Sequence, residues 1–337
     1  MSKSLFSKDV MKDFMEAVQT IPLDEIDLGD DTFSVNFKPD LRKLRASIES
    51  VGLIEPILLR RQPKGFQIVC GFRRVAVLGE LRMSRVEARV CEEVEDLKLF
   101  VLALHDNLTT RSWNVVEKAV ALDKLVHRFR VDRARVIRQF LPLFDLETNE
   151  KILETFLALA RMEDELKEFV LREEVSRSNI RRFGAFSEED RKAVLTILYP
   201  LKWGENSLRE VLTLLEEVAQ RDGVTIKQVT ESPKIKGIVA QEGLPSPQKV
   251  ERLKKVLWGM RYPRRNRLEE EFERSSRSLC LPPNIKLFPA PHFEEKSLGL
   301  QLRFRTLKEF RSALDTLSRV VDQPSFRSLL ERFGDEG

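Results

Sequence analysis

The sequence predicts an α+β protein built from three unlike parts, and three observations on the spacing of apolar residues support this. Short strand-like apolar runs mix with helical patterns from residue 21 to about residue 94. Apolar residues three or four positions apart then dominate from residue 97 to about residue 223. The C-terminal part returns to two strand-like runs and a helix. We therefore expect an α+β unit, an all-helical middle domain and a small C-terminal strand-strand-helix domain.

The composition and the charge of the chain limit its possible functions. The chain has 337 residues with 42% hydrophobic content, which gives room for two or three domains with cores of their own. Its 58 basic and 54 acidic side chains leave a formal net charge of +4. Because the charges nearly cancel, a nucleic-acid surface must come from local clusters of basic residues.

The cysteines, the histidines and the lack of long apolar runs argue against several classes of protein. No two cysteines form a C-x-x-C pair and the histidines stand apart, so we expect no zinc site or disulfide framework among Cys70, Cys91, Cys280, His105, His127 and His292. The N-terminal segment carries acidic residues among its apolar ones, and no long apolar run follows. We expect a cytoplasmic protein with reduced thiols and no membrane span.

The α+β unit is predicted to contain four short strands and two helices. Apolar runs bounded by turn signals predict the strands, at 21–26, 56–60, 66–70 and 86–91. Apolar residues at helical spacing predict helices at 38–52 and 73–83, and Gly52 is a C-cap signal for the first of them.

The middle of the chain is predicted to be almost entirely helical. Six segments carry apolar residues three or four apart, namely 95–108, 113–129, 133–144, 149–162, 164–174 and 207–220. Proline-containing breaks at 232–234 and 244–247 mark a boundary. We accordingly expect an N-terminal helical tail, an α+β domain, a helical domain, a basic linker with a helix, and a C-terminal piece at 1–20, 21–96, 97–230, 231–282 and 283–337.

The C-terminal piece is predicted to consist of two strands followed by a helix. The strands lie at 284–291 and 298–305, and the second alternates apolar with mostly polar residues. Thr306 and Glu309 form a capping-box pattern at the start of a helix with an apolar face. Such a piece is too small to bury its sheet alone. We expect it to pack on a second copy, which predicts a homodimer, or on another domain.

The segment VCGFRRVAVLGEL, residues 69–81, joins a predicted strand to a predicted helix. A glycine lets the backbone approach a ligand closely, and the free amides of a helix start favour an anion. Arg73 and Arg74 add guanidinium groups whose geometry suits phosphate oxygens. The junction therefore predicts a phosphate site, while a tight turn with solvated arginines is the alternative.

Four segments, taken in order, resemble the ParB-type partitioning proteins of bacterial chromosomes and plasmids. They are TIPLDEIDL, LRASIESVGLIEPILLR, GFQIVCGFRRVAVLGEL and LALHDNLTTRSWNVVEKAVAL. The resemblance covers roughly residues 21–125, and a weaker helical register continues to about residue 191. It implies a ParB/sulfiredoxin-like N-terminal domain and a degenerate helix-turn-helix in the helical domain.

The resemblance also implies that the first unit binds CTP together with Mg²⁺. By position, the residues expected at the nucleotide are Gly52, Ile54, Pro56, Gly71, Arg73, Arg74, Asn107 and Arg111. The first three would border the pyrimidine base and the others would contact the phosphates. Asp106 and Asn107 would hold the metal, which agrees with the preference of Mg²⁺ for oxygen ligands. Arg111 lies one residue beyond the place of the motif arginine, which is Thr110 here.

Phe72 is the departure from the family pattern that bears most on catalysis. It stands where the family has a glutamate associated with CTP hydrolysis, and a phenyl ring cannot act as a base or bind metal. We therefore expect weak or no hydrolysis and name no catalytic residue. The junction also resembles that of sulfiredoxin, but Cys70 precedes the glycine instead of following it, which argues against sulfiredoxin chemistry.

Three segments are candidates for contact with DNA. The helix-turn-helix pattern covers 133–162, and its expected recognition helix, 149–159, offers Lys151 beside two glutamates. Phosphate contacts are expected from the segment SRSNIRRF and from a later tract rich in lysine and arginine. The basic residues concerned are Arg177, Arg181, Arg182, Lys254, Lys255, Arg264 and Arg265.

Together these features predict a dimeric, nucleoid-associated, ParB-like CTP-binding DNA clamp or adaptor acting in partitioning or nucleoid organisation. Two alternatives stay open. One is a nucleotide-gated protein adaptor that has lost sequence-specific DNA binding, and the other is a nuclease or phosphotransferase on the same fold. The N-terminal tail lacks the basic segment with a Leu-Gly-x-Gly-Leu motif that is usual in the family, so the sequence does not support a ParA-type ATPase as partner.

Overall fold

The computed structural model describes residues 17–92, 94–293 and 295–334, and the chain divides into two compact units between Ser187 and Glu188. The predicted N-terminal helical tail therefore lies outside the described residues except for 17–20, which lead into the first strand. Among the described residues, no helix combines the length and the apolar content needed to cross a membrane.

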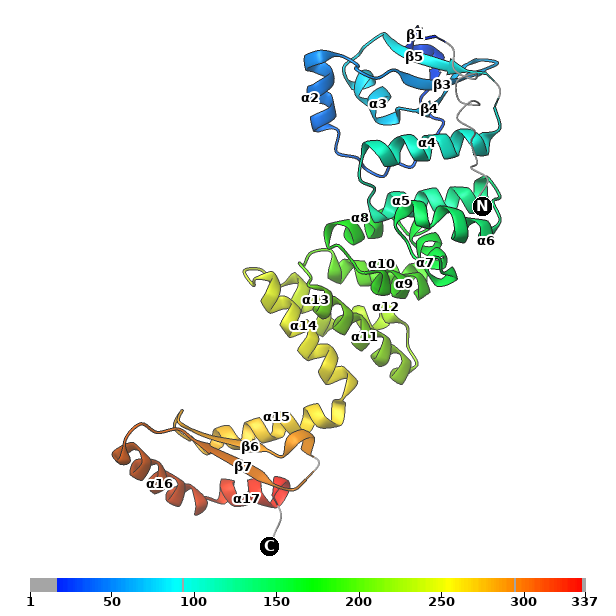
Figure 1. The fold of residues 1–337 in the computed structure, drawn as a ribbon. Helices are drawn as coiled ribbons and strands as arrows, with labels where there is room; N and C mark the ends of the chain where they lie inside the picture. The colour runs from blue at the N-terminus through cyan, green and yellow to red at the C-terminus, as the bar shows by residue number, and fades with distance from the viewer. Residues whose placement is uncertain (1–16, 93, 294, 335–337) are drawn as a thin grey trace. The chain divides into compact units, whose positions relative to one another are not determined.

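A five-stranded mixed sheet opens the first unit (Figure 1). The strands run in the order β1-β5-β3-β4-β2, with β1–β5 and β3–β4 antiparallel and β5–β3 and β4–β2 parallel. They are β1 (Gln19–Pro22), β2 (Ile26–Asp27), β3 (Ile57–Gln62), β4 (Gly65–Cys70) and β5 (Arg85–Cys91). A 3₁₀ turn, Leu23–Glu25, divides the run predicted as one strand at 21–26. Ile57, Leu59 and Val90 on the central strands are fully buried, and this burial specifies the register.

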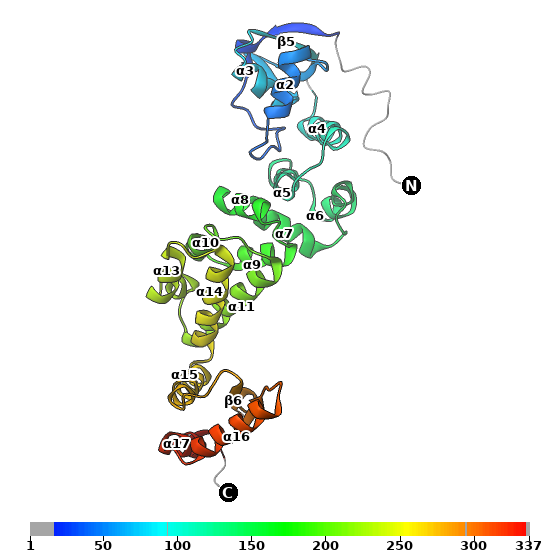
Figure 2. The same ribbon diagram turned by 90° about the vertical axis from the view of Figure 1, so that its left-hand side faces the viewer.

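Three helices accompany the sheet (Figure 2). α2 (Arg42–Val51) and α3 (Phe72–Glu80) lie beside it, and α4 (Asp96–Thr110) follows β5 and packs against β4. Ile48 of α2 and Val75 of α3 belong to the same hydrophobic core as the strands. The α+β fold predicted for this part of the chain is confirmed, because each predicted strand and helix has its counterpart.

The rest of the first unit is helical. Its elements are α5 (Val115–Asp123), the π-helical turn η2 (Lys124–Arg128), α6 (Arg133–Arg135), the π-helical turn η3 (Val136–Phe140), the 3₁₀ turn η4 (Pro142–Phe144), α7 (Glu150–Ala160), α8 (Asp164–Arg172) and α9 (Arg177–Ala185). α7, the predicted recognition helix, packs on α5 and α9 and buries Leu153, Phe156 and Leu159. Lys151 is exposed near its start. The helix-turn-helix itself stays a prediction.

The second unit begins with five helices. They are α10 (Glu188–Leu198), α11 (Glu205–Asp222), α12 (Ile226–Thr230), α13 (Pro233–Ala240) and α14 (Ser246–Arg261). Pro233 does not interrupt the helical structure, because it occupies the first turn of α13. A backbone N–H at that position would have no partner within the helix, so its absence costs nothing. Residues 188–230 therefore lie in one compact unit with 231–282, whereas the sequence assigned these two stretches to different domains.

The C-terminal piece contains the two predicted strands and the predicted helix, with one further helix on each side. Its elements are α15 (Pro263–Ser278), the antiparallel pair β6 (Ile285–Pro289) and β7 (Leu298–Leu302), α16 (Leu307–Val321) and α17 (Pro324–Phe333). Phe272, Leu329 and Phe333 form part of its core. Thr306 caps α16 by accepting a hydrogen bond from the N–H of Glu309 at 3.2 Å, while the Glu309 carboxylate accepts one from the Arg305 N–H.

Several large apolar side chains of the C-terminal piece remain in contact with solvent. Phe288, Leu300, Phe304, Leu307 and Leu314 have exposed fractions of 49%, 48%, 53%, 66% and 47%. A single copy thus leaves part of its strand pair and of α16 uncovered, as the small size of the piece predicts. The homodimer stays a prediction.

Candidate functional site

Gly71 lies at the junction between β4 and α3 and has the left-handed backbone that glycine favours, with φ 103° and ψ 17°. A Cβ at this position would come within 2.7 Å of Cγ2 of Ile57, so the junction requires glycine for space as well as for conformation. The first helical hydrogen bond joins the Val75 N–H to the Gly71 carbonyl at 3.0 Å. The preceding amides of the helix start therefore have no carbonyl of α3 to bond, which suits an anion.

A cavity of about 540 Å³ opens at this helix start. It brings together all the residues predicted at the phosphates and the metal, namely Gly71, Arg73, Arg74, Asp106, Asn107 and Arg111. Lys43 of α2 and Asn36 also line it, and the sequence analysis did not identify either. Four basic side chains therefore line this cavity, together with the carboxylates of Asp40, Glu55 and Asp106.

Arg73 and Arg111 share the carboxylate of Glu117, which lies on α5. Nη2 of Arg73 is 2.6 Å from Oε1 of Glu117, and Nη1 of Arg111 is 2.6 Å from Oε2. The Glu117 side chain is only 1% exposed. Burial, followed by the nearby charge of Arg111, lowers the pKa of Arg73 below its usual value despite the ion pair.

Two asparagines hold the same cluster in place. Asn36 accepts hydrogen bonds through Oδ1 from Nε of Arg73 at 2.9 Å and from Nη2 of Arg111 at 3.3 Å. Asn114 caps α5, because its Oδ1 accepts the Glu117 N–H at 2.8 Å and its own N–H donates to Oε2 of Glu117. The N-x-x-E spacing of this capping box was the sequence signal that could have identified Glu117.

Arg74 points in a different direction and anchors the segment before β3. Its Nη1 donates to the carbonyl oxygens of Glu55 at 2.8 Å and Pro56 at 3.3 Å, and lies 3.6 Å from the Glu55 carboxylate. The side chain is 18% exposed, so it is held more firmly than a solvated arginine. The alternative of a turn with two solvated arginines therefore does not describe the structure.

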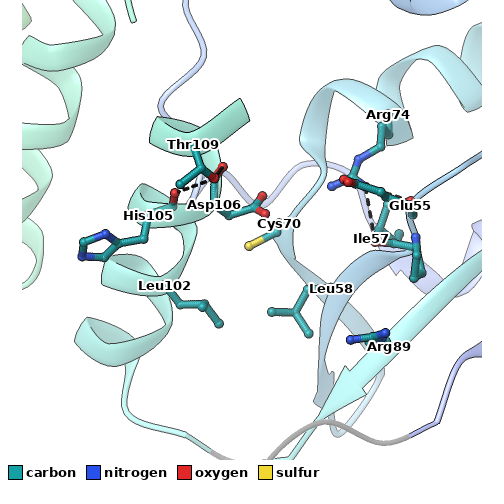
Figure 3. Close-up of a pocket in the computed structure, with 11 residues that line it drawn as sticks. Glu55, Ile57, Leu58, Cys70, Arg74, Arg89, Leu102, His105, Asp106 and Thr109 are labelled. Carbon is teal, nitrogen blue, oxygen red and sulfur yellow. Dashed lines mark hydrogen bonds and ion pairs between the residues drawn. The ribbon is translucent and has the colours of Figure 1, made fainter. Parts of the chain in front are cut away.

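A second cavity of about 470 Å³ adjoins the first, and both are lined by Glu55, Arg74 and Asp106 (Figure 3). Leu102 and Asp106 of α4 lie opposite Leu58 and Cys70 of the sheet, whereas the His105 ring points away from the sheet. Of the three residues predicted at the base, Pro56 lines this cavity, whereas Gly52 and Ile54 line neither. Ile54 is instead 77% exposed.

The candidate metal ligands differ in how free they are. Asp106 lines both cavities. The carboxamide of Asn107 is already engaged, since Nδ2 donates to the Ala103 carbonyl at 2.8 Å and Oδ1 accepts from Nε of Arg111 at 3.1 Å. Among the described residues, no three His, Cys, Asp or Glu side chains gather as a metal site. A magnesium ion would thus take most of its ligands from phosphate and water.

Neither Phe72 nor Cys70 provides a reactive group at the junction. Phe72 lines the first cavity and also packs against the core of the α+β domain. Cys70 is buried, and this burial, together with the Asp106 carboxylate, raises the pKa of its thiol well above the usual range. The thiolate is therefore strongly disfavoured.

Residues 8–108 match the family model of the ParB N-terminal domain. The chain is therefore similar to the ParB family in its N-terminal part. It is 33% identical over 97 residues to a probable chromosome-partitioning protein ParB of Vibrio cholerae, a match that covers 28% of this chain and 33% of the relative. It is 21% identical over 236 residues to a nucleoid occlusion protein of Bacillus mycoides, covering 68% of this chain and 78% of the relative.

Solved structures of ParB proteins are also similar to this chain, at low overall superposition. One is a C-terminally truncated ParB of Caulobacter crescentus complexed with CTP-gamma-S. The sequence identity is 21%, the match covers 51% of this chain and 94% of that chain, and the TM-score is 0.26. The ParB of the same organism complexed to the centromeric parS site has 17% identity, 63% and 96% coverage, and a TM-score of 0.33.

The predicted DNA-contacting residues of this chain lie in very different surroundings. Arg177 forms an ion pair with Glu147 at 3.2 Å, while Arg181 is exposed and Arg182 is half-buried. Lys254 forms ion pairs with Glu210 at 2.9 Å and Glu251 at 3.0 Å. These acids neutralise part of the charge that the sequence assigned to phosphate contact.

Three more of the predicted DNA-contacting residues lie in the later basic tract, and one of them is paired with an acid. Arg265 forms an ion pair with Glu269 at 3.1 Å and lies 4.5 Å from the ring centroid of Trp258. Lys255 and Arg264 are exposed, and within the described part of the chain neither forms an ion pair. The free positive charge of the tract is therefore smaller than its composition suggests.

Proposed function

We propose that this chain is a ParB-like protein that binds CTP with Mg²⁺ at the start of α3 and acts as a dimeric DNA clamp or adaptor in partitioning or nucleoid organisation. The observation that carries the proposal is the cavity at Gly71, where the amides of a helix start meet Arg73, Arg74, Arg111 and Lys43. A polyphosphate suits such a site, because the amides of a helix start and guanidinium groups both bind phosphate oxygens.

Each part of the nucleotide has residues suited to it. The triphosphate would lie at the α3 amides with Arg73, Arg74 and Arg111 around it, and Asp106 would meet a magnesium ion bound to the phosphates. The adjoining cavity offers Pro56, with Ile57, Leu58 and Leu102 as a largely apolar lining, to the base and the ribose. Magnesium would neutralise phosphate charge, and the chain's own residues would bind and orient the ligand.

Turnover is expected to be weak or absent. Phe72 offers no carboxylate to orient a water molecule at the phosphates. Among the described residues, the carboxylates that line this cavity are those of Asp40, Glu55 and Asp106, and the first is held by Arg42 at 2.6 Å. The chain would thus act as a latch that opens when the nucleotide leaves.

The DNA-binding part of the proposal relies on the basic residues that remain unneutralised. Arg181, Lys255 and Arg264 are exposed and would contact phosphates without reading bases. Relatives named as partitioning and nucleoid occlusion proteins support an action on the chromosome. The exposed apolar residues of α16 and the β6–β7 pair support assembly of two copies through the C-terminal piece.

A second candidate is a nucleotide-gated protein adaptor, and one observation favours it. The exposed start of α7 carries Glu150 and Glu154 in ion pairs with Arg133, so it presents acids where a DNA-reading helix needs donors. An electrophoretic shift with and without CTP separates the two candidates, because the adaptor would not retard DNA in either state.

Calorimetric titration with CTP, ATP, GTP and UTP in magnesium buffer tests the site itself. We expect CTP to bind and the other three to bind at least about tenfold more weakly, a difference of about 1.4 kcal/mol. The variant Gly71→Val, which adds a side chain where Ile57 leaves no room, serves as the unliganded reference. Failure of all four nucleotides to bind the unmodified chain would contradict the proposal.

A further inference from the structure

Glu117 forms ion pairs with two of the arginines, Arg73 and Arg111, that the proposed function gives to the ligand. Both of its carboxylate oxygens are used, one by Arg73 and the other by Arg111, each at 2.6 Å. The exposed fractions are 1% for Glu117, 27% for Arg73 and 15% for Arg111. The carboxylate thus lies behind the two guanidinium groups, and these groups form part of the cavity wall.

A carboxylate between two arginines mimics the contacts of a phosphate group. Guanidinium forks bind carboxylate and phosphate oxygens with the same planar, charge-assisted geometry. Two positive groups and one negative group leave a net charge of +1, so the buried carboxylate cancels half of the attraction that the arginines would exert on an anion. A ligand that takes full contacts from both arginines must weaken their bonds to Glu117.

We propose that Glu117 is an internal competitor that sets the affinity of the cavity, because phosphate binds by displacing its carboxylate from Arg73 and Arg111. The inference rests on the proposed function and adds to it an affinity-determining residue outside the cavity wall. It also predicts that occupancy of the site loosens the start of α5, since Glu117 is the third residue of that helix.

The arginines keep a second support when the carboxylate releases them. Oδ1 of Asn36 accepts from both, at 2.9 Å from Nε of Arg73 and 3.3 Å from Nη2 of Arg111. Oδ1 of Asn107 also holds Nε of Arg111 at 3.1 Å. These neutral acceptors orient the guanidinium groups toward the cavity without cancelling their charge, so loss of the Glu117 charge strengthens the site.

The opposite role is that Glu117 positions the arginines for the ligand, and the two roles predict opposite changes. The variant Glu117→Gln removes the charge, keeps the length of the side chain and retains the capping box, because glutamine serves at this position as well as glutamate. A competitor predicts tighter binding in this variant, whereas a positioning residue predicts weaker binding.

The test is calorimetric titration of the full chain with CTP in magnesium buffer and, separately, with inorganic tripolyphosphate. We expect Glu117→Gln to bind both anions at least about tenfold more tightly than the unmodified chain, which corresponds to about 1.4 kcal/mol. Glu49→Gln is the matched control, because Glu49 carries the same charge on α2, pairs with Arg45 at 3.1 Å and does not line the cavity. Its affinity should not change.

A third variant keeps the test decisive if the glutamine variant does not fold. Glu117→Asp retains the charge but is one methylene too short to reach both arginines, so a smaller tightening is expected. Equal or weaker binding in a folded variant would overturn the inference while leaving the proposed function intact. Absence of binding to the unmodified chain and to the variants, for CTP and tripolyphosphate alike, would instead overturn the proposed function and with it the inference.

Discussion

Arg73 and Glu117 should be coupled by about 2 kcal/mol in the free energy of unfolding of the first unit. The perturbation is a double-mutant cycle with Arg73→Met and Glu117→Gln, alone and together. The two side chains lie 2.6 Å apart, and the carboxylate is 1% exposed, so the bond is charge-assisted and shielded from water. Bonds of this kind contribute about 1.5–3 kcal/mol.

The expected coupling energy between Arg73 and Glu117 is smaller than that of an isolated buried ion pair, for a structural reason. Removing one partner of such a pair costs about 3–5 kcal/mol, because the other charge is left buried and unpaired. Here the loss of Arg73 leaves Glu117 with Arg111 at 2.6 Å, and the two arginines also cease to repel each other. Both effects reduce the free energy of unfolding that is lost when Arg73 is removed.

Urea unfolding followed by the fluorescence of Trp113 measures the cycle. Trp113 is 8% exposed, and its ring centroid lies 5.3 Å from the guanidinium of Arg111, so it reports on this part of the first unit. Trp203 and Trp258 belong to the second unit and are replaced by phenylalanine in every variant, so that the signal does not mix two transitions.

The exposed pair Arg45 and Glu49 is the control for this cycle. Its side chains are 47% and 49% exposed, and solvent-screened pairs with this helical spacing contribute about 0.3–0.5 kcal/mol. A coupling between Arg73 and Glu117 no larger than that of the control pair would refute the reasoning that burial makes the contact strong.

Four further outcomes are expected. Arg74→Ala should abolish CTP binding in calorimetry, because a planar donor fork leaves the cavity wall and the segment before β3 loses its anchor. Phe72→Glu should lower the free energy of unfolding by about 2–3 kcal/mol, since the carboxylate would replace a ring packed on the core, and the unmodified chain should release no phosphate from CTP. Of the three thiols, only Cys280 should react quickly with a disulfide reagent at about pH 8, because burial raises the pKa of the other two. Replacing Leu307 and Leu314 together by lysine should shift sedimentation of the full chain from dimer to monomer without loss of helix, because both are exposed on α16.

Each of these outcomes has a result that contradicts it. Unchanged CTP affinity in Arg74→Ala would remove Arg74 from the site. Steady phosphate release by the unmodified chain, above that of a variant lacking Arg73 and Arg74, would show that Phe72 does not prevent hydrolysis. Fast reaction of two or more thiols would contradict the burial of Cys70 and Cys91. A chain that sediments as a monomer before any substitution would contradict the proposed dimer.

Much of the α+β domain and the junction of glycine and helix at Gly71 could be predicted because they depend on local properties. The spacing of Val75 and Leu78 predicts α3, and the glycine before it predicts a helix start with free amides, which the left-handed φ of Gly71 bears out. The second helix of the C-terminal piece, α17, was not predicted, although Leu329 and Phe333 have helical spacing. No helix was predicted beyond the capped helix that begins after Thr306.

Partners of charged side chains could not be predicted, since they come from distant segments. Glu117 lies 44 residues after Arg73, and Lys254 meets Glu210 of another helix. The composition of the basic tract suggested free positive charge, but folding brings acids of α11 beside it. Likewise, Gly52 and Ile54 were predicted at the base from their sequence position, but neither residue lines either cavity.

The sequence by itself determined that this chain has an α+β domain in which a glycine precedes a helix start, because hydrophobic period and glycine conformation act over a few residues. Tertiary structure alone decided that Arg73 and Arg111 converge on Glu117 and that Arg74 holds the segment at Glu55. The physical reason is that the strength of a charge contact depends on distance and on burial, and both arise only when separate elements pack together.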